Sequence, residues 1–125
     1  MPLVPGLAAK AELTVAEVDT ALAIGSGDVP VLATPRLVSL FEEAALHCVE
    51  GYVPAGSTTV GIRVQIDHLH PTSVGSTVIA EATLDKVEGR RLTFTVSAND
   101  RCGLIAAGKV TRVIVDTERF MEKAR

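Results

Sequence analysis

The sequence predicts an α+β fold in which a long central helix is wrapped by a curved antiparallel β-sheet. Residues 34–49 carry a long helical pattern, and nearly all of residues 58–116 alternates between apolar and polar side chains. This alternation is typical of strands with one buried face. The expected strands approach ten residues or more, which exceeds the usual five or six. With a single long helix available, a sheet that curls around this helix buries the apolar faces of both elements.

Length and composition narrow the class of protein. A chain of 125 residues fits one domain, expected to span residues 1–125, and the 47% of hydrophobic residues excludes a disordered chain. The net charge is −3, and the chain has three phenylalanines, one tyrosine and no tryptophan. Because it lacks both a basic run and residues for stacking on bases, we expect no nucleic-acid partner.

Location and cofactor use can also be predicted. The apolar stretches are too short to cross a bilayer and the first residues do not form a secretory signal, so we expect a cytoplasmic protein with no membrane partner. Cys48 and Cys102 lack C-x-x-C spacing, which favours reduced thiols. His68 and His70 could ligate a metal only with a third partner, which the pattern around them does not offer. We therefore expect neither a metal nor an organic cofactor.

The segment before the helix is expected to be mostly irregular. Residues 1–10 are interpreted as an N-terminal arm and residues 11–15 as a short strand. The link that follows contains the sequence Gly-Ser-Gly-Asp at residues 25–28, which is typical of loops.

The helix is expected to begin with Thr34 as its N-cap and Pro35 at the first helical position, where a missing N–H is tolerated. At roughly 100° per residue, the apolar side chains form one wide arc. Glu42 lies at the margin of this arc, whereas Glu43 lies on the polar side. A carboxylate removed from water is unfavourable unless it is paired, so Glu42 is a candidate functional residue. The arc consists of Leu37, Val38, Leu40, Phe41, Ala44, Ala45, Cys48 and Val49.

Four strands and a short helix are expected after the helix ends near Gly51. Glu88 and Gly89 predict a tight hairpin between the second and third strands, because glycine readily adopts a positive φ. The expected strands are residues 58–70, 76–87, 91–98 and 104–115, followed by a terminal helix over 117–125.

Alternation also predicts which side chains face the helix. In the last strand, Arg112 shares its face with Val110, so a buried charge there needs a partner unless a bulge turns it outward. Gly61 lies inside the first strand, where a glycine permits close approach of a ligand. The side chains of the first strand that are expected to face the helix are Val60, Ile62, Val64, Ile66 and His68.

Four motifs stand out in this layout: Ala33-Thr34, Leu40-Phe41-Glu42-Glu43-Ala44-Ala45, His68 seven residues before Gly75, and Val87-Glu88-Gly89-Arg90-Arg91-Leu92. Taken together, they resemble the fluoroacetyl-CoA thioesterase-like family of the hotdog-fold thioesterase superfamily over about residues 10–120. The resemblance implies a hotdog fold and hydrolysis of short acyl-CoA thioesters, with coenzyme A as part of the substrate. It also implies a homodimer or a dimer of dimers, whose sheets join edge to edge around an interfacial pocket.

The resemblance implies roles for individual residues. Thr34, Glu42 and His68 match the family's catalytic threonine, glutamate and histidine. Gly61 matches a glycine beside the thioester carbonyl, and Arg112 matches an arginine near the active site.

The link before the helix departs from the family pattern. The fluoroacetyl-specific enzyme has an aromatic lid there, whereas residues 21–32 contain no aromatic residue. Asp28 stands where a lid phenylalanine is expected. We therefore do not expect fluoroacetyl-CoA to be the preferred substrate, although thioester cleavage is less affected by this change.

Thioester hydrolysis needs a nucleophile or an activated water, a stabiliser for the oxyanion, and exclusion of bulk water. Glu42 suits direct attack or activation of water, and His68 could hold that carboxylate or relay a proton. Thr34 could cap the helix, position groups in the pocket, or do both. A backbone N–H near Gly61, or the free N–H groups at the start of the helix, could stabilise the oxyanion.

Each assignment has a structural alternative. Glu42 could form an interface ion pair, Thr34 could be a plain N-cap, and His68 could be a structural histidine. Arg90 and Arg91 beside the hairpin turn could meet the phosphates of coenzyme A, although a solvated turn is the simpler interpretation. We predict an acyl-CoA thioesterase. The alternatives are a hotdog hydratase or dehydratase, and an acyl-CoA-binding or sensing protein that cleaves nothing.

Overall fold

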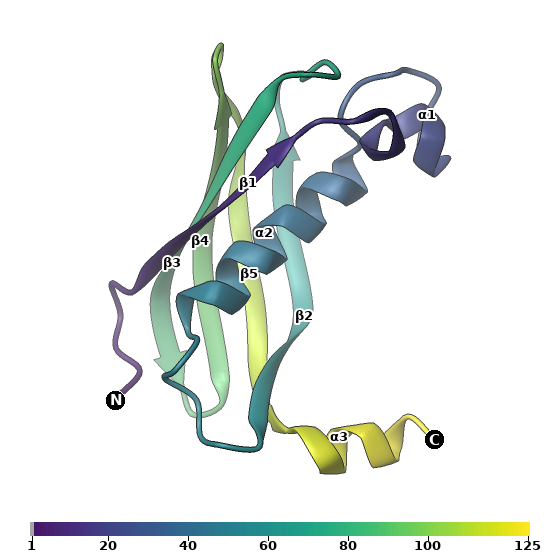
Figure 1. The fold of residues 1–125 in the computed structure, drawn as a ribbon. Coiled ribbons are helices and arrows are strands. Elements are labelled where there is room, and N and C mark those ends of the chain that lie inside the picture. Colours follow the sequence, from purple (N-terminus) through teal and green to yellow (C-terminus); the bar gives the residue numbers. More distant parts are fainter. Residues whose placement is uncertain (1) are drawn as a thin grey trace.

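An antiparallel sheet of five strands forms the body of the molecule in the computed structural model, which describes residues 2–125. The strand order is β1-β3-β4-β5-β2, so β1 and β2 form the two edges (Figure 1). Every neighbouring pair of strands is antiparallel. The strands are β1 (Ala8–Thr14), β2 (Ser57–His68), β3 (Thr77–Glu88), β4 (Arg91–Asp100) and β5 (Gly103–Asp116).

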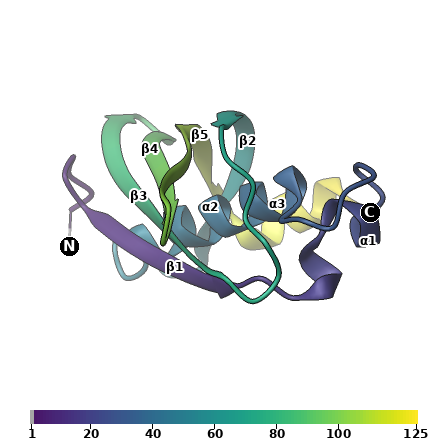
Figure 2. The same ribbon diagram turned by 90° about the horizontal axis from the view of Figure 1, so that it is seen from above.

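The longest helix, α2 (Thr34–Cys48), lies across the concave face of this sheet (Figures 1 and 2). Its predicted apolar arc is buried except for Val38, which is half-buried, and Leu40 and Phe41 have no exposed surface. These side chains pack with Leu84 of β3 and Phe94 of β4 in one core. The predicted architecture of a long helix wrapped by a curved antiparallel sheet is therefore confirmed.

The start of α2 corrects one prediction. Ala33 is the N-cap residue, and Thr34 is the first residue of the helix with Pro35 next to it. No side chain caps this end of the helix, and the Leu37 N–H donates to the Ala33 carbonyl at 3.0 Å. The prediction that Thr34 is the N-cap is wrong, because the chain enters the helix one residue earlier. The Thr34 hydroxyl is consequently available for a different partner.

A β-bulge in β2 corrects a second prediction. The pairing of β2 with β5 shifts between Gly61 and Arg63, and such a shift changes the face to which the following side chains point. Thr59, before the bulge, is buried, whereas Ile62 is 48% exposed. The prediction that Val60 and Ile62 face the helix is therefore wrong. Beyond the bulge, the later apolar residues of β2 pack against the core as expected.

The segments around the sheet differ only in detail from the expected ones. β1 begins at Ala8, so it starts before the predicted end of the arm. The link to α2 contains a 3₁₀ turn, η1 (Glu17–Asp19), and a one-turn helix, α1 (Ala21–Ile24), capped by the Thr20 side chain. The expected terminal helix is α3 (Thr117–Lys123), and it projects from the end of β5 (Figure 1).

Three general features bear on the environment of the protein. Cys48 is a buried free thiol and Cys102 is an exposed one. Across residues 2–125, no helix is long and apolar enough to cross a membrane. Over the same residues, the His, Cys, Asp and Glu side chains form no group of three or more that could hold a metal ion.

Candidate active site

Two of the predicted site residues meet where α2 begins and β2 ends. Thr34 is the first residue of α2, and His68 is the last residue of β2. The Thr34 Oγ1 and the His68 Nδ1 lie 2.8 Å apart, within hydrogen-bond distance. Because the Thr34 hydroxyl does not cap the helix, it can hold the imidazole in one orientation.

The surroundings of His68 favour a neutral imidazole. Burial lowers the pKa of His68 below its ordinary value of 6.5, and a hydrogen bond with the backbone of His70 offsets this only in part. The His68 Nε2 is buried and has no hydrogen-bond partner among residues 2–125. An unpaired buried polar atom costs about 1–3 kcal/mol, so such an atom in a native protein calls for a functional explanation. A substrate or a second protein copy could supply its partner.

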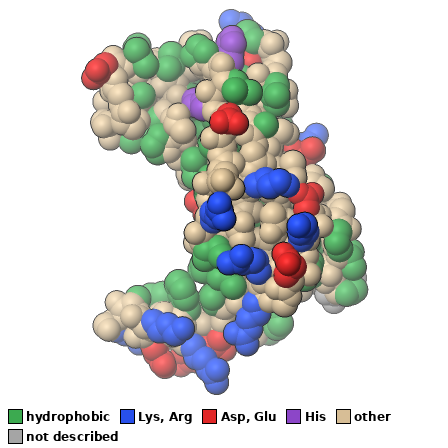
Figure 3. Space-filling model, turned by 180° about the vertical axis from the view of Figure 1, so that it is seen from behind, with side chains coloured by type: hydrophobic (Ala, Val, Ile, Leu, Met, Phe, Trp, Pro, Cys, Tyr) green, Lys and Arg blue, Asp and Glu red, His purple; other side chains and the backbone are tan. Residues whose placement is uncertain are grey.

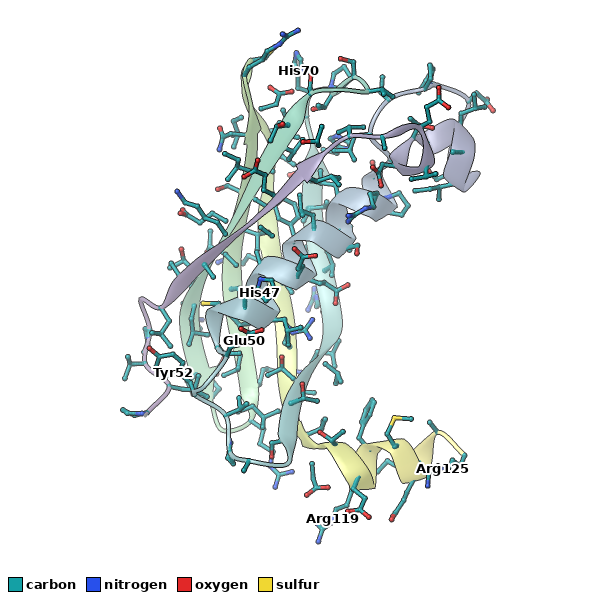
Figure 4. The ribbon with its side chains drawn as sticks, viewed as in Figure 1. His47, Glu50, Tyr52, His70, Arg119 and Arg125 are labelled. Atoms are coloured by element: carbon teal, nitrogen blue, oxygen red, sulfur yellow. The ribbon has the colours of Figure 1, made fainter. Side chains whose placement is uncertain are left out.

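A cavity of about 360 Å³ opens beside the Thr34–His68 pair. Its walls come from the link before α2, from the start of α2, and from the segment after β2. Asp28 is exposed and does not line the cavity, and the link contributes no aromatic side chain. His70 also lies at this end of the molecule, where its Nδ1 is 2.8 Å from the Pro71 carbonyl oxygen (Figure 4). The apolar part of the lining consists of Ala21, Gly27, Val29, Val31, Leu32, Pro35, Leu69 and Pro71.

A second cluster lies farther along α2, around Glu42. The Arg112 Nη1 of β5 donates to the Glu42 Oε2 at 3.1 Å, and the Arg112 side chain is 8% exposed. Arg112 also donates to Thr59, from Nε to the hydroxyl at 3.0 Å and from Nη2 to the carbonyl oxygen at 2.7 Å. Burial lowers the pKa of the Arg112 guanidinium, and the Glu42 carboxylate partly offsets that effect. An arginine nevertheless stays charged at neutral pH.

Gly61 makes room for the Glu42 carboxylate. The bulge turns Gly61 toward α2, and a Cβ atom at this position would overlap the Glu42 Oε2. The same Cβ would lie 3.5 Å from the Arg112 Nη1. A glycine is therefore required if Glu42 is to reach Arg112 across the strand.

Within one chain, the two clusters are separate. Thr34 and Glu42 are eight residues apart on α2, which corresponds to about 12 Å of helical rise. Gly61 and His68 are seven residues apart on β2, or about 23 Å along a strand. No hydrogen bond or ion pair joins Glu42 to His68 within residues 2–125. The structure thus groups Thr34 with His68, and groups Glu42 with Gly61 and Arg112.

Thr59 anchors Arg112, and the sequence pattern does not mark it as a site residue. Simple alternation from His68 assigns Thr59 to the solvent face, and only the bulge brings it inward. Gly61 was the available signal, because a glycine inside a strand often marks a bulge. The pairing of Arg112 with Glu42 supplies the partner that a buried arginine was predicted to need.

Comparison with known proteins points to one family. Residues 15–118 match a family model described as fluoroacetyl-CoA-specific thioesterase. A fluoroacetyl-CoA thioesterase from Streptantibioticus cattleyicolor is 36% identical over 95 residues, which are 76% of this chain and 68% of that protein.

Solved structures agree with this result. The structure of a fluoroacetyl-CoA thioesterase matches with a TM-score of 0.94 and 28% identity, over 100% of this chain and 97% of that chain. Variants of that enzyme have been solved with fluoroacetate and coenzyme A, and with acetyl-CoA. A thioesterase superfamily member from Thermus thermophilus matches with a TM-score of 0.91 and 28% identity, over 99% of this chain and 92% of that chain. The protein therefore has the hotdog fold and belongs to the family of fluoroacetyl-CoA-specific thioesterases, a family of acyl-CoA thioester hydrolases.

Proposed function

We propose that this protein hydrolyses a short acyl-CoA thioester to a free acid and coenzyme A, in an active site shared by two copies of the chain. Its membership of a thioesterase family supports the reaction. The observation that carries the shared site is the separation of the Thr34–His68 pair from the Glu42–Arg112 pair within one chain. The first pair supplies the imidazole and the second supplies the carboxylate. One chain alone therefore has an incomplete site.

The edge strand β2 supports the pairing of two copies. β2 is hydrogen-bonded to β5 on one side only, and its other edge is open. The edge includes Ile62, which is 48% exposed. A long, open and partly apolar edge strand is a ready template for pairing with another strand. Figure 3 shows that the molecule is hollowed beside this edge, between the end that carries the histidines and the projecting α3.

A two-fold axis near the middle of β2 would complete the site. If β2 pairs antiparallel with β2 of a second copy, the Gly61 end of one strand lies beside the His68 end of the other. Glu42 of one protomer would then approach the Thr34–His68 pair of its partner across the interface. The same operation creates two equivalent sites, because contacts in a two-fold dimer are reciprocal. The proposed assembly is a dimer or a dimer of such dimers.

In this site, Glu42 acts on the thioester carbonyl directly or through a water molecule. Arg112 holds the Glu42 Oε2, which leaves Oε1 to attack the carbonyl carbon or to accept a proton from water. Backbone N–H groups near Gly61 stabilise the negative charge on the carbonyl oxygen. If Glu42 attacks directly, the C–S bond breaks and an anhydride between the acyl group and Glu42 forms, which water then cleaves. If Glu42 activates water, the hydroxide adds to the carbonyl carbon and the C–S bond then breaks. In both cases the neutral imidazole of the partner's His68 accepts the proton released by water and then passes it to the thiolate sulfur of coenzyme A.

The same groups make a metal or an organic cofactor unnecessary in this proposal. A carboxylate supplies the base or nucleophile, an imidazole carries the proton, and N–H groups stabilise the oxyanion. We place the reaction in the cytoplasm, which the free thiols of Cys48 and Cys102 support, because reducing compartments keep cysteines unpaired.

The cavity beside the Thr34–His68 pair supports a short aliphatic acyl group. Its apolar lining consists of small and aliphatic side chains. Asp28, which stands where a lid aromatic was expected, is exposed. We therefore propose that the preferred substrate carries a short saturated acyl chain and that selectivity for the fluoroacetyl group is not shared with the relatives.

One observation favours a second candidate function, the binding of acyl-CoA without cleavage. Glu42 is already paired with the buried Arg112 within one chain, which gives this carboxylate a structural role. Such a protein would bind the ester and release no coenzyme A above the uncatalysed rate. Measurement of free thiol therefore separates the two candidates.

Mixed dimers test the shared site. The Glu42→Gln and His68→Ala variants are each expected to be nearly inactive as homodimers. When they are mixed, unfolded and refolded together, about half of the dimers contain one chain of each kind, and one of the two sites in each mixed dimer is intact. About a quarter of the wild-type rate of coenzyme A release should return.

The control for this experiment mixes two variants of the same cluster, Glu42→Gln and Gly61→Ala. If Glu42 and Gly61 of one chain serve the same site, each site in this mixture carries either the Glu42→Gln or the Gly61→Ala change. The mixture is therefore expected to stay inactive. Recovery of activity in the control, or no recovery in the first mixture, would contradict the proposed arrangement.

The pH dependence follows from the environment of His68. Its pKa is lowered by burial, so the imidazole should stay neutral as the pH falls to 6.5 and should protonate only below that value. The acid limb of kcat/KM is therefore expected below pH 6.5. Because the unfolded chain takes up this proton first, the free energy of unfolding should fall as the pH drops from about 6.5 toward the lowered pKa. An NMR titration of the His68 ring, assigned with His68→Gln, checks the direction, and a midpoint at or above 6.5 contradicts it.

A further inference from the structure

A groove of about 670 Å³ lies at the end of the sheet where β2 begins and β5 ends. Three cationic side chains, Arg90, Arg119 and Lys123, line it together with one carboxylate, Asp116. The whole chain has a net charge of −3, so the positive charge of this groove is opposite in sign to the net charge of the protein. Figure 3 shows Lys and Arg side chains gathered over this end of the molecule, and Figure 4 shows Arg119 on α3, at the opposite end from His70.

Backbone hydrogen bonds hold the walls of the groove in place. The Ile114 N–H donates to the Arg90 carbonyl at 2.9 Å, which fixes the β3–β4 turn beside β5. The Thr117 N–H donates to the Gly56 carbonyl at 3.0 Å, which fixes the start of α3 against the loop before β2. The walls are therefore formed by three segments that come together only in the folded chain.

The cationic side chains in the groove do not belong to the hydrophobic core. α3 has no buried residue, and Phe120 is 39% exposed on it. The Asp116 Oδ1 accepts a hydrogen bond from the Arg119 N–H at 3.0 Å, so this carboxylate serves as the cap of α3. The charges of Arg90, Arg119 and Lys123 have no ion-pair partner within residues 2–125. They are available for an anionic ligand.

The groove extends to the face of the sheet that carries the Glu42–Arg112 pair. Arg112 and Ile114 are two residues apart on β5, so their side chains share a face, and Ile114 lines the groove. Gly61 pairs with Arg112 and Ser57 pairs with Asp116. Four residues of strand, or about 13 Å, therefore separate the predicted thioester position from the groove. An extended pantetheine arm can follow the strands between the two.

The geometry points to this groove as the binding site of the 3′-phosphorylated ADP moiety of the acyl-CoA substrate. Arg90, Arg119 and Lys123 contact phosphate oxygens, since guanidinium and ammonium groups are the usual protein partners of phosphate. Phe120 provides an apolar face for the adenine ring. This inference rests on the proposed function and extends it, because it assigns the part of the protein that recognises the nucleotide rather than the acyl group.

Calorimetric titration with coenzyme A tests the assignment without requiring turnover. The double variant Arg119→Ala/Lys123→Ala is expected to raise the Kd for coenzyme A about tenfold, because two exposed cations at a phosphate each contribute modestly. The matched control, Lys86→Ala/Arg101→Ala, also removes two exposed cations but lies outside the groove, and its Kd should equal that of the wild type. Dephospho-coenzyme A should bind the wild type more weakly and lose less affinity in the groove variant.

Kinetics provide the second measurement. The groove variant should show a raised KM and an unchanged kcat with acyl-CoA, and no change with the matching acyl-pantetheine, which lacks the nucleotide. An unchanged Kd in the groove variant, an equal loss in the control, or no measurable binding of coenzyme A by the wild type would overturn the inference. Binding at the groove with no hydrolysis by the wild type would instead leave the inference standing and remove the proposed catalytic function.

Discussion

Glu42→Gln is expected to reduce kcat for acyl-CoA hydrolysis by about 10²–10⁴-fold, the range for loss of a positioned acid or base. The amide cannot attack the thioester or accept a proton from water at neutral pH. It has nearly the shape of the carboxylate and can still accept a hydrogen bond from Arg112, so the ion-pair cluster should keep its arrangement. The measurement is release of free thiol from a series of short acyl-CoA esters, together with the thermal unfolding midpoint.

The matched control for this variant is the neighbouring residue. Glu43→Gln makes the same chemical change one position along α2, where the side chain is exposed. It should leave kcat and KM unchanged. Full activity in Glu42→Gln would remove Glu42 from the mechanism and would leave it as the structural partner of Arg112.

Gly61→Ala is expected to abolish most activity and to lower the free energy of unfolding by about 1–3 kcal/mol, the usual range for overpacking. The added methyl group overlaps the position of the Glu42 Oε2. The carboxylate must therefore move away from Arg112, which then has a buried charge without its partner. Rate measurements and chemical denaturation report the two effects separately.

A double-mutant cycle with Glu42→Ala shows whether the overlap is the cause. In the absence of the Glu42 carboxylate, the Gly61 methyl group has space, so Gly61→Ala should add little destabilisation to Glu42→Ala. The two changes are then strongly non-additive, as expected for residues in contact. Additive losses would mean that Gly61→Ala acts through the backbone of β2 and not through Glu42.

The fold was predictable because it depends on local patterns. The apolar arc of α2 and the long alternating segments lead to a helix covered by a sheet, and the structure contains both. The turn at Gly89 was also predictable, because its φ of 64° favours glycine in a tight hairpin. Each of these features is decided by residues close together in the sequence.

The candidate site was only partly predictable. The position of Glu42 at the margin of the apolar arc indicated a carboxylate in need of a partner, and Arg112 was identified as a charge in need of one. The sequence did not indicate that the two would pair with each other, because seventy residues separate them. The errors at Thr34 and in β2 have a similar origin. The N-cap of α2 lies one residue before the predicted position, and the bulge in β2 adds one residue to the strand. Each shift of one residue gives a side chain a different partner or a different face of the sheet.

The sequence by itself determined the hotdog layout, the helix that carries Glu42 and the strand that carries His68, because hydrophobic periodicity is a local property of the chain. Only the tertiary structure decided which side chains meet. It placed His68 beside Thr34, brought Arg112 and Thr59 to Glu42, and collected Arg90, Arg119 and Lys123 around one groove. Contacts between distant segments depend on strand register and on the path of the turns, and a single bulge is enough to change them.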